Sequence, residues 1–267
     1  MGQGYTGKPL FASTFTYAWT KVYGEEWVKH ALADEVPMPG QFPPAGMCQA
    51  LRRAFPDRDL QLFHEGSTLI TKARCHAAGA FLRSGADVLV SFDDDVVTSP
   101  DVLRSLVAAC EEVKTLVSAP CIVRSGTNIN WVLEGDRFDR ARVERTGDAW
   151  LYPVERIGFG LFAIHRLAME QMAAAAEWIT TESAPPYPAC FREDVREHSW
   201  IGEDFHFTER MRSMGMQPYA LLDVVVWHAG HSGSVTTEGV LQCDPDTAKT
   251  LVRKDRDTPT FPAPESP

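Results

Sequence analysis

Residues 88–95 read Val-Leu-Val-Ser-Phe-Asp-Asp-Asp, a nearly all-apolar run that ends in three consecutive carboxylates. A short apolar run of this kind is typical of a strand buried on both faces, as in a parallel sheet covered by helices. Open α/β sheets bind their ligands beyond the carboxyl ends of their strands. The stretch therefore predicts a central buried strand with a polar site at its end.

Strand and helix patterns alternate on both sides of this stretch. In the first half we expect, in chain order, a strand at 9–16, a helix at 44–55, a helix at 68–83 capped by Ser67, a helix beginning after Ser99 and a strand at 116–123. This alternation predicts an α/β fold with a Rossmann-like, mostly parallel central sheet flanked by helices.

The second half has a different rhythm. There we expect, in chain order, a β-hairpin at 129–143 turning near Glu134-Gly135-Asp136, a strand at 154–164, a helix at 166–178, a long loop at 179–200, a helix at 203–214 and a strand at 219–227. The end of the chain is rich in proline and has no periodicity, which predicts an extended or disordered tail at 244–267.

The charge balance of the chain limits its partners. Its 267 residues include 26 basic and 36 acidic side chains, a formal net charge of −10 at pH 7. Non-specific binding to nucleic acid or to an anionic membrane is unfavourable for such a chain, because it depends on neutralising phosphates with Lys and Arg. The sequence has no signal-peptide pattern, no apolar run of membrane-spanning length and no closely spaced cysteine pair. We therefore expect a cytoplasmic protein with reduced cysteines and no stable membrane anchor.

The three aspartates are the most informative group in the sequence. In an extended segment residues i and i+2 point the same way, so Asp93 and Asp95 are expected to share a face while Asp94 points elsewhere. Two carboxylates at close range repel each other unless a cation joins them, and oxygen ligands suit Mg²⁺ or Mn²⁺. The alternative is an acidic turn that caps the helix after Ser99.

Three other features are candidates for the same site. Glu203 and Asp204 open a predicted helix, although acidic first turns are common on any helix. His228 and His231 follow the last core strand, where a metal ligand and a solvated loop histidine are both open interpretations. Arg74 lies on a predicted helix and becomes relevant only if it faces the same crevice.

Taken together, these features resemble the GT-A fold of nucleotide-sugar glycosyltransferases, and most closely the small single-domain enzymes of bacteria and their phages. The matching pieces, in order, are the first strand and its turn from Leu10, Ser67 to Arg74, the Asp-x-Asp match at Asp93-Asp94-Asp95, Ile157-Gly158-Phe159-Gly160 with Ile164-His165-Arg166, Gly202-Glu203-Asp204-Phe205 with Arg210 and Gly215, and His228. The resemblance implies one catalytic domain at 1–243, with a nucleotide-binding half at about 1–123 and an acceptor half at about 124–243 that adds a β-hairpin and an acceptor-side segment.

The resemblance also implies residue roles around a UDP- or GDP-sugar donor. A divalent cation, Mn²⁺ or Mg²⁺, would bridge the two phosphates of the donor. The implied metal ligands are Asp93, Asp95 and His228, the implied nucleotide contacts are Ala12, Ser13, Thr14, Arg74 and Asp94, and the implied lining of the sugar pocket is Gly158 and Gly160. For residues 12–14 a plain polar strand end is the alternative.

The chemistry of such a transfer agrees with these roles. Breaking a glycosyl-diphosphate bond leaves a diphosphate, whose developing charge a bound cation stabilises. An inverting transfer also needs a carboxylate that deprotonates the acceptor hydroxyl. We expect Asp204 to be this base, with Glu203 as a second acceptor-side or sugar-binding group.

The leading hypothesis is therefore a metal-dependent glycosyltransferase, with the acceptor left open between a small molecule, a glycan and a modified base in DNA. A DNA acceptor would need a local basic patch such as residues 52–53 or 137–145. Aromatic residues at 178–200 form either an acceptor platform or a surface loop pinned by buried rings. A metal-dependent phosphohydrolase or nuclease, and a sugar-nucleotide-binding module without turnover, are the alternatives to the transferase.

Overall fold

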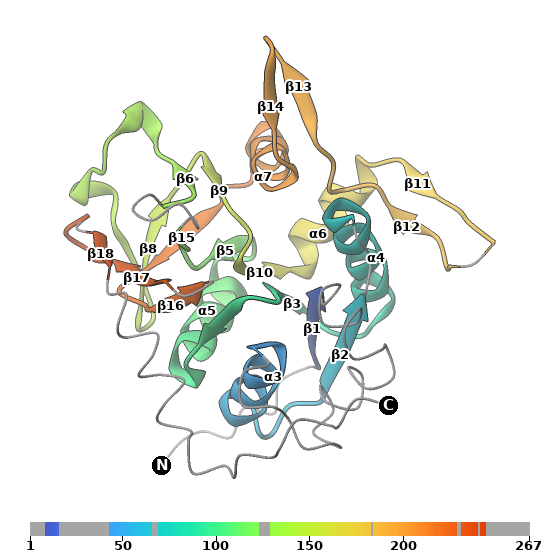
Figure 1. Ribbon diagram of the computed structural model, residues 1–267, viewed down its shortest axis with the longest axis horizontal. Coiled ribbons are helices and arrows are strands. Elements are labelled where there is room, and N and C mark those ends of the chain that lie inside the picture. Colours follow the sequence, from blue (N-terminus) through green and yellow to red (C-terminus); the bar gives the residue numbers. More distant parts are fainter. Residues whose placement is uncertain are drawn as a thin grey trace, which may run out of the picture.

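An eight-stranded mixed sheet forms the centre of the protein (Figure 1). The computed structural model describes residues 9–15, 43–65, 69–122, 129–182, 184–228, 231–239 and 241–243. Across the sheet the strands are β2 (Leu60–Glu65), β1 (Leu10–Phe15), β3 (Val88–Asp93), β10 (Leu161–His165), β5 (Leu116–Ser118), β15 (Tyr219–Leu222), β8 (Ala149–Pro153) and β7 (Glu144–Thr146).

Most of these strands run in one direction. β1 pairs in parallel with β2 and β3, and β5 pairs in parallel with β15. Only β10 and β8, among the strands of this sheet, run against the others, because each pairs antiparallel with both of its neighbours. The α/β fold is therefore confirmed, and the sheet is mixed: most strands share one direction, but β10, inserted between β3 and β5, and β8 make their pairings antiparallel.

Helices cover both faces of the sheet (Figure 1). The described helices are α3 (Pro43–Ala54), α4 (Ile70–Arg83), α5 (Pro100–Val113), α6 (Arg166–Ala174) and α7 (Glu203–Ser213). One core cluster joins α3 and α5 to one face, and a second joins α4, α6 and α7 to the other. None of these helices is long and apolar enough to cross a membrane.

Strand β3 shows why its sequence is almost continuously apolar. Val88, Val90 and Phe92 pack into the cluster under α3 and α5, whereas Leu89 packs into the cluster under α4 and α6. Both faces of the strand are buried, so a polar side chain on either face would lose its hydration. The strand ends at Asp93, as the sequence predicts.

The predicted hairpin at 129–143 is wrong. β6 (Trp131–Val132) pairs with β9 (Arg156–Ile157), which is distant in the sequence, and 3₁₀ turns occupy Glu134–Asp136 and Arg140–Arg142. The hairpin in this region is β7–β8, whose two-residue turn begins at Gly147 with φ of +59°. Glycine adopts this left-handed conformation without a steric penalty, which places the reversal there.

Two predicted strands are interrupted. The strand expected at 154–164 divides into β9 and β10 on either side of residues 158–160, and the strand expected at 219–227 divides into β15 and β16 (Val226–His228). β16 leaves the central sheet and joins a second sheet with β4 (Val96–Thr98), β17 (His231–Val235) and β18 (Leu241–Cys243). The pairing of β16 with β4 brings His228 beside the turn that follows Asp93.

The expected loop at 179–200 contains two short strand pairs. They are β11 (Trp178–Ile179) with β12 (Tyr187–Pro188), and β13 (Asp194–Arg196) with β14 (Ser199–Ile201). The helix predicted at 166–178 ends at Ala174, and β2 is a half-buried strand that the sequence analysis does not predict. The predicted cap Ser67 and the predicted tail at 244–267 lie outside the described residues.

A glycine in α4 permits the close packing of β12, which generates a prediction. A Cβ atom at Gly79 would lie 2.7 Å from Cβ and 3.1 Å from Cα of Tyr187. We expect Gly79→Ala to lower the free energy of unfolding by about 1–3 kcal/mol, because the backbone of β12 must move. Urea denaturation followed by circular dichroism measures this effect.

Gly46→Ala in α3 is the matched control, since a Cβ atom at this helical glycine meets nothing within 4 Å. Alanine is the better helix former, so this variant should be more stable by about 0.5–1 kcal/mol. Equal effects of the two substitutions would contradict the packing argument.

Candidate functional site

A pocket of about 230 Å³ lies at the carboxyl end of β3. Seven of the predicted site residues line it, namely Arg74, Asp93, Gly158, Gly160, Glu203, Asp204 and His228. The remaining lining residues are Ile70, Cys121, Ile122, Asn130 and Phe159. Segments that are far apart in the sequence thus converge where an α/β sheet is expected to bind its ligand.

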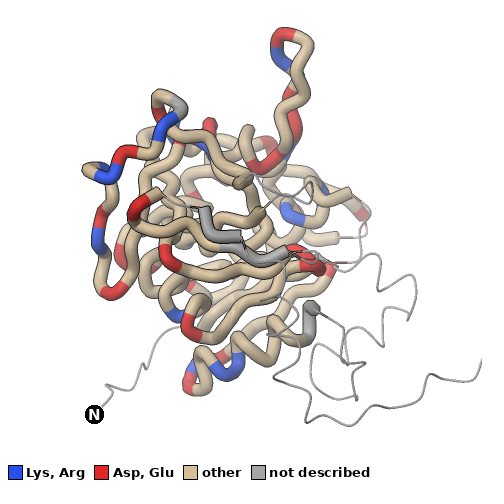
Figure 2. Tube along the Cα trace, turned by 60° about the vertical axis from the view of Figure 1, so that its left-hand side comes forward, with Lys and Arg blue, Asp and Glu red and all other residues tan. Residues whose placement is uncertain are grey.

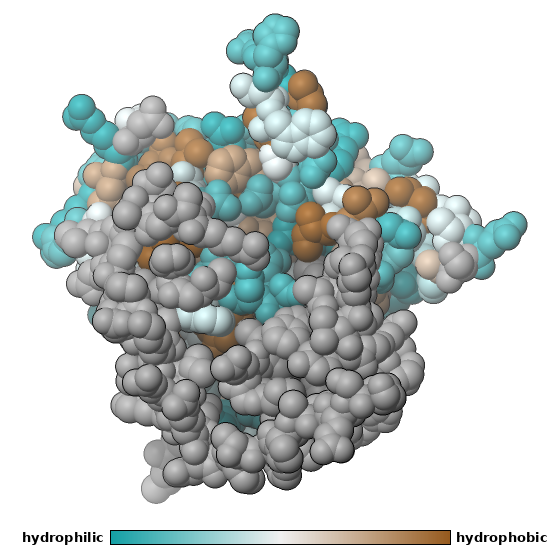
Figure 3. All heavy atoms as spheres, viewed as in Figure 1, coloured by the Kyte–Doolittle hydropathy of each residue, from teal (hydrophilic) through white to brown (hydrophobic). Residues whose placement is uncertain are grey.

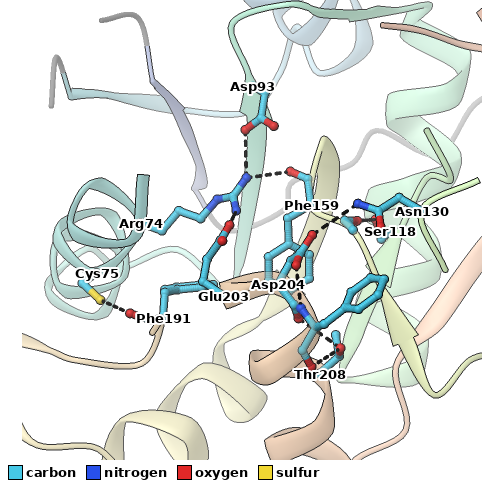
Figure 4. Close-up of polar contacts among 12 residues, drawn as sticks. Arg74, Cys75, Asp93, Ser118, Asn130, Phe159, Phe191, Glu203, Asp204 and Thr208 are labelled. Carbon is cyan, nitrogen blue, oxygen red and sulfur yellow. Dashed lines mark hydrogen bonds and ion pairs between the residues drawn. The ribbon is translucent and has the colours of Figure 1, made fainter. Parts of the chain in front are cut away.

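Arg74 connects three elements at the centre of this pocket (Figure 4). Its side chain is only 4% exposed. Nη2 donates hydrogen bonds to Oδ1 of Asp93 at 2.9 Å and to the carbonyl oxygen of Phe159 at 3.2 Å, and Nη1 donates to Oε1 of Glu203. Arg74 of α4 therefore links the end of β3 to the first turn of α7, and it meets the condition that it face the crevice at the end of β3.

Asp93 and Asp95 are not alternate residues of one extended strand, although the sequence analysis expects this arrangement. β3 ends at Asp93, and Asp94 and Asp95 form the turn that leads into β4, so the alternation of an extended strand stops before Asp95. Asp93 pairs with Arg74, whereas Oδ1 of Asp95 lies 3.3 Å from Nε2 of His228. Burial raises the pKa of Asp93, Arg74 opposes this rise and Asp95 adds to it.

His228 is held in a defined orientation by the backbone. Its Nδ1 lies 2.8 Å from the carbonyl oxygen of Ile122, which can only accept a hydrogen bond, so Nδ1 carries the proton. In the neutral ring Nε2 is then an acceptor that faces the carboxylate of Asp95, and the hydrogen bond to Asp95 raises the pKa of His228. A proton or a cation between Nε2 and the carboxylate satisfies both groups.

The donor set is compatible with Mg²⁺ or Mn²⁺. Among the described residues, no group of three or more His, Cys, Asp or Glu side chains is arranged to hold a metal ion. Asp95 and His228 nevertheless present an oxygen and a nitrogen donor side by side, and Asp93 is close enough to influence the charge of the site. Mg²⁺ is commonly bound through one or two carboxylates together with substrate phosphates, so this pair fits such an ion.

Asn130 is a site residue that the sequence analysis misses. Its Nδ2 donates a hydrogen bond to Oδ2 of Asp204 at 3.3 Å, and the N–H of Phe205 donates to Oδ1 at 2.7 Å (Figure 4). A Cβ atom at Gly158 would overlap the side chain of Asn130. The glycine therefore leaves the space from which Asn130 orients Asp204, and no local pattern around Asn130 reveals this role.

Asp204 has the electrostatic character of a general base. Burial, followed by the nearby charge of Glu203, raises the pKa of Asp204 to about 6. Glu203 has a different partner, because it is paired directly with Arg74. Asp204 is thus ionised near pH 7 but binds a proton more readily than an ordinary carboxylate.

The wall of the pocket at 158–160 consists largely of backbone. The hydroxyl of Ser118 lies 2.8 Å from the carbonyl oxygen of Gly158 and 3.1 Å from that of Leu161. A Cβ atom at Gly160 would lie 2.8 Å from Sγ of Cys121. The two glycines let the chain pass close to its neighbours, and a ligand in the pocket meets backbone on this side.

The predicted nucleotide contacts other than Arg74 lie outside the lining of this pocket. Ala12, Ser13 and Thr14 are buried residues within β1 and do not form the expected turn. The hydroxyls of Ser13 and Thr14 are buried without a hydrogen-bond partner in the described part of the chain. Asp94 lies in the turn after β3, and the side chain of His231 is outside the described residues.

Comparison with known proteins does not assign the chain to a family. No protein-family model matches it, and no curated protein matches it. Among solved structures, it is similar to A197 from STIV, with 14% identity and a TM-score of 0.47 over 87% of this chain and 92% of the other. It is also similar to an apo UDP-glucose pyrophosphorylase, with 11% identity and a TM-score of 0.44 over 93% of this chain and 82% of the other. Likenesses of this size do not identify an activity.

The contacts of Arg74 generate a stability prediction. Arg74→Met leaves Asp93 and Glu203 without their buried cation, so we expect the free energy of unfolding at pH 7 to fall by about 3 kcal/mol. Lys72→Met on the exposed side of the same helix is the control and should change it by less than about 0.5 kcal/mol. Urea denaturation measures both variants, and similar stabilities would refute the central role of Arg74.

The raised pKa of Asp204 generates a pH-dependent prediction. In the folded protein ionisation of Asp204 is unfavourable, so stability is lost as the pH rises from about 4, its ordinary value, to about 6. Asp204→Asn removes this cost and should raise the free energy of unfolding at pH 7 by on the order of 1–3 kcal/mol, and by less at pH 5. The exposed Asp101→Asn variant should show no such difference between the two pH values. A destabilised Asp204→Asn protein at pH 7 would contradict the assignment.

Proposed function

We propose that the chain is a metal-dependent glycosyltransferase of the GT-A type that moves a sugar from a nucleotide-diphosphate sugar to a hydroxyl acceptor. The observation that carries this proposal is that one pocket is lined both by Asp204, a carboxylate with a raised pKa, and by His228, which contacts Asp95. The first group suits proton abstraction, and the second suits a cation beside phosphates. We further propose that one catalytic domain spans residues 1–243.

Asp204 is the proposed general base. Its two oxygens are oriented by Asn130 and by the N–H of Phe205, which keeps the carboxylate in one position in the pocket. With a pKa of about 6, it is ionised at pH 7 and can take the proton of an acceptor hydroxyl as the hydroxyl attacks the sugar. Glu203, which is paired with Arg74, would raise the basicity of Asp204 through its neighbouring charge.

The part of the pocket at His228 is the proposed diphosphate side. Asp95 and His228, with Asp93, would hold the cation, which when bound supplies positive charge that stabilises the departing diphosphate. Ile122 orients His228 through its carbonyl oxygen, and Arg74 favours the ionised form of Asp93 by opposing the rise in its pKa. The donor's phosphates would therefore meet a site in which the ligands are already oriented.

The donor itself would lie against backbone and small residues. Gly158 and Gly160 line the pocket without side chains, so a sugar ring can approach the chain there. Asp94 and residues 12–14 remain the proposed nucleotide contacts. The unbonded hydroxyls of Ser13 and Thr14 are compatible with this role, since a buried hydroxyl is stabilised by a hydrogen-bond partner.

DNA is the less favoured acceptor. In the suggested basic patch at 137–145, one of the two that the sequence offers, Arg140 pairs with Glu238, Arg142 with Glu134 and Arg145 with Asp148. Both signs of charge alternate along the described surface loops (Figure 2). Paired arginines offer little net charge to a phosphate backbone, so the proposal favours an uncharged acceptor.

The proposal predicts that Asp95→Ala abolishes transfer. Loss of this ligand should lower the rate of sugar transfer by at least about 10²-fold, because the charge that stabilises the leaving group is lost. Asp101→Ala, which removes an exposed aspartate, is the control and should keep full activity. Intact transfer by Asp95→Ala after removal of metal with a chelator would refute the proposal, and release of phosphate without transfer would favour a hydrolase.

A thermal-shift screen identifies the donor. UDP- and GDP-sugars are tested with and without Mn²⁺ or Mg²⁺, and a donor that binds the folded state raises the melting temperature by an amount that grows with the ratio of its concentration to its Kd. We expect stabilisation only when nucleotide-sugar and metal are both present. Equal stabilisation without metal would contradict the assigned role of Asp95 and His228.

A further inference from the structure

We propose that a second pocket, beneath the β13–β14 hairpin, is the acceptor subsite and binds a neutral carbohydrate. This inference rests on the proposed function, because it assigns a class of acceptor to the same enzyme. The pocket has a volume of about 380 Å³, and its lining includes Thr71, Phe191, Arg192, Val195 and Trp200.

The second pocket borders the first. Ile70 lines the first pocket and Thr71 lines the second, so the first turn of α4 lies between them. β14, which carries Trp200, leads through Gly202 directly into α7, where Glu203 and Asp204 line the first pocket. The second pocket therefore adjoins the pocket that contains the proposed base.

One wall of this pocket is an exposed apolar surface. Val195 and Trp200 are opposite each other in the hairpin and are 60% and 68% exposed. The hairpin projects from the body of the protein, and apolar to neutral surface is visible along it below a hydrophilic tip (Figures 1 and 3). Large apolar side chains kept in water on a projecting element are typical of a binding surface.

The aromatic residues of this region divide into two roles. Tyr187 and Phe191 are buried, at 5% and 3% exposed, so they pin the segment to the body of the protein. Trp200 remains exposed at the pocket, as a platform requires. The buried rings thus match the pinned surface loop, and the proposal assigns the platform role to Trp200.

The base of the hairpin is rigidly supported. The ring of Phe191 stacks on that of Phe207 with centroids 4.4 Å apart and planes 7° from parallel. Its carbonyl oxygen accepts a bond from Sγ of Cys75 at 3.3 Å, and the carbonyl oxygen of Arg192 lies 2.8 Å from Nδ1 of His206. Because α4 and α7 hold this base, the pocket is formed before a ligand binds, which lowers the entropic cost of binding.

The chemistry of the lining favours a sugar over a nucleic acid. A flat indole with hydrogen-bonding groups beside it matches a sugar ring, which has an apolar face and a polar edge. Arg192 is the basic residue of the lining, whereas Glu193 and Asp194 are both acidic. The nearby Arg196 is already paired with Asp194 at 2.6 Å and with Glu209 at 2.9 Å. This surplus of carboxylates disfavours a phosphodiester chain.

Saturation-transfer NMR with maltose, cellobiose and lactose tests the assignment. With the wild-type protein, we expect magnetic saturation to pass to the ring protons of at least one of these neutral disaccharides. Trp200→Ala should weaken its binding about tenfold, and Trp200→Phe should retain most of it. Trp178→Ala is the matched control, because Trp178 is 50% exposed in the other strand pair but lines neither pocket.

Three results would overturn the inference. The first is that no saturation transfer reaches any of the three disaccharides with the wild-type protein. The second is that Trp200→Ala and Trp178→Ala bind the disaccharide equally well. The third is a gel shift of duplex DNA that Trp200→Ala abolishes. The rise in melting temperature that nucleotide-sugar and metal cause together is measured on the same variants, and it should be unchanged in Trp200→Ala. If nucleotide-sugar and metal do not raise the melting temperature but the disaccharide still binds, the result counts against the proposed function alone. Failure of the proposed function and failure of the acceptor subsite can thus be told apart.

Discussion

The placement of one guanidinium group among carboxylates governs the architecture of the site. Arg74 is buried at the point where β3 ends and α7 begins, and both of these elements bring acidic side chains into the same pocket. Buried carboxylates without a counter-charge would be costly to ionise. The pairing of Arg74 with Asp93 and Glu203 makes their convergence possible, and it links the helix layer to the end of the central strand.

This pairing also distinguishes two neighbouring carboxylates. Glu203 is tied to the guanidinium, whereas Asp204 points to Asn130 and is left with a raised pKa of about 6. Adjacent residues in one helical turn thus have different partners, and burial raises the pKa of Asp204. An environment that raises the pKa of one carboxylate suits that group for acid–base chemistry.

The mixed sheet is what allows the site to be assembled. β10 runs between β3 and β5, and the segment before it returns to the end of β3, where Gly158 and Gly160 form the pocket wall. β16 then leaves the central sheet to pair with β4, which sets His228 next to Asp95. The hairpin that bears Trp200 leads through Gly202 into the same helix, α7, whose first turn carries Glu203 and Asp204.

Local sequence by itself determined the buried strand that ends at Asp93, helices α3 and α5, and the residue types of the site, because apolar periodicity and caps such as Ser99 depend on near neighbours. The tertiary structure alone decided that β6 pairs with β9, that Asp93 and Asp95 face different partners, that Asn130 orients Asp204 and that Trp200 stays exposed. These outcomes depend on which distant segments meet and on which buried charges find a partner. Neither is encoded within a window of neighbouring residues.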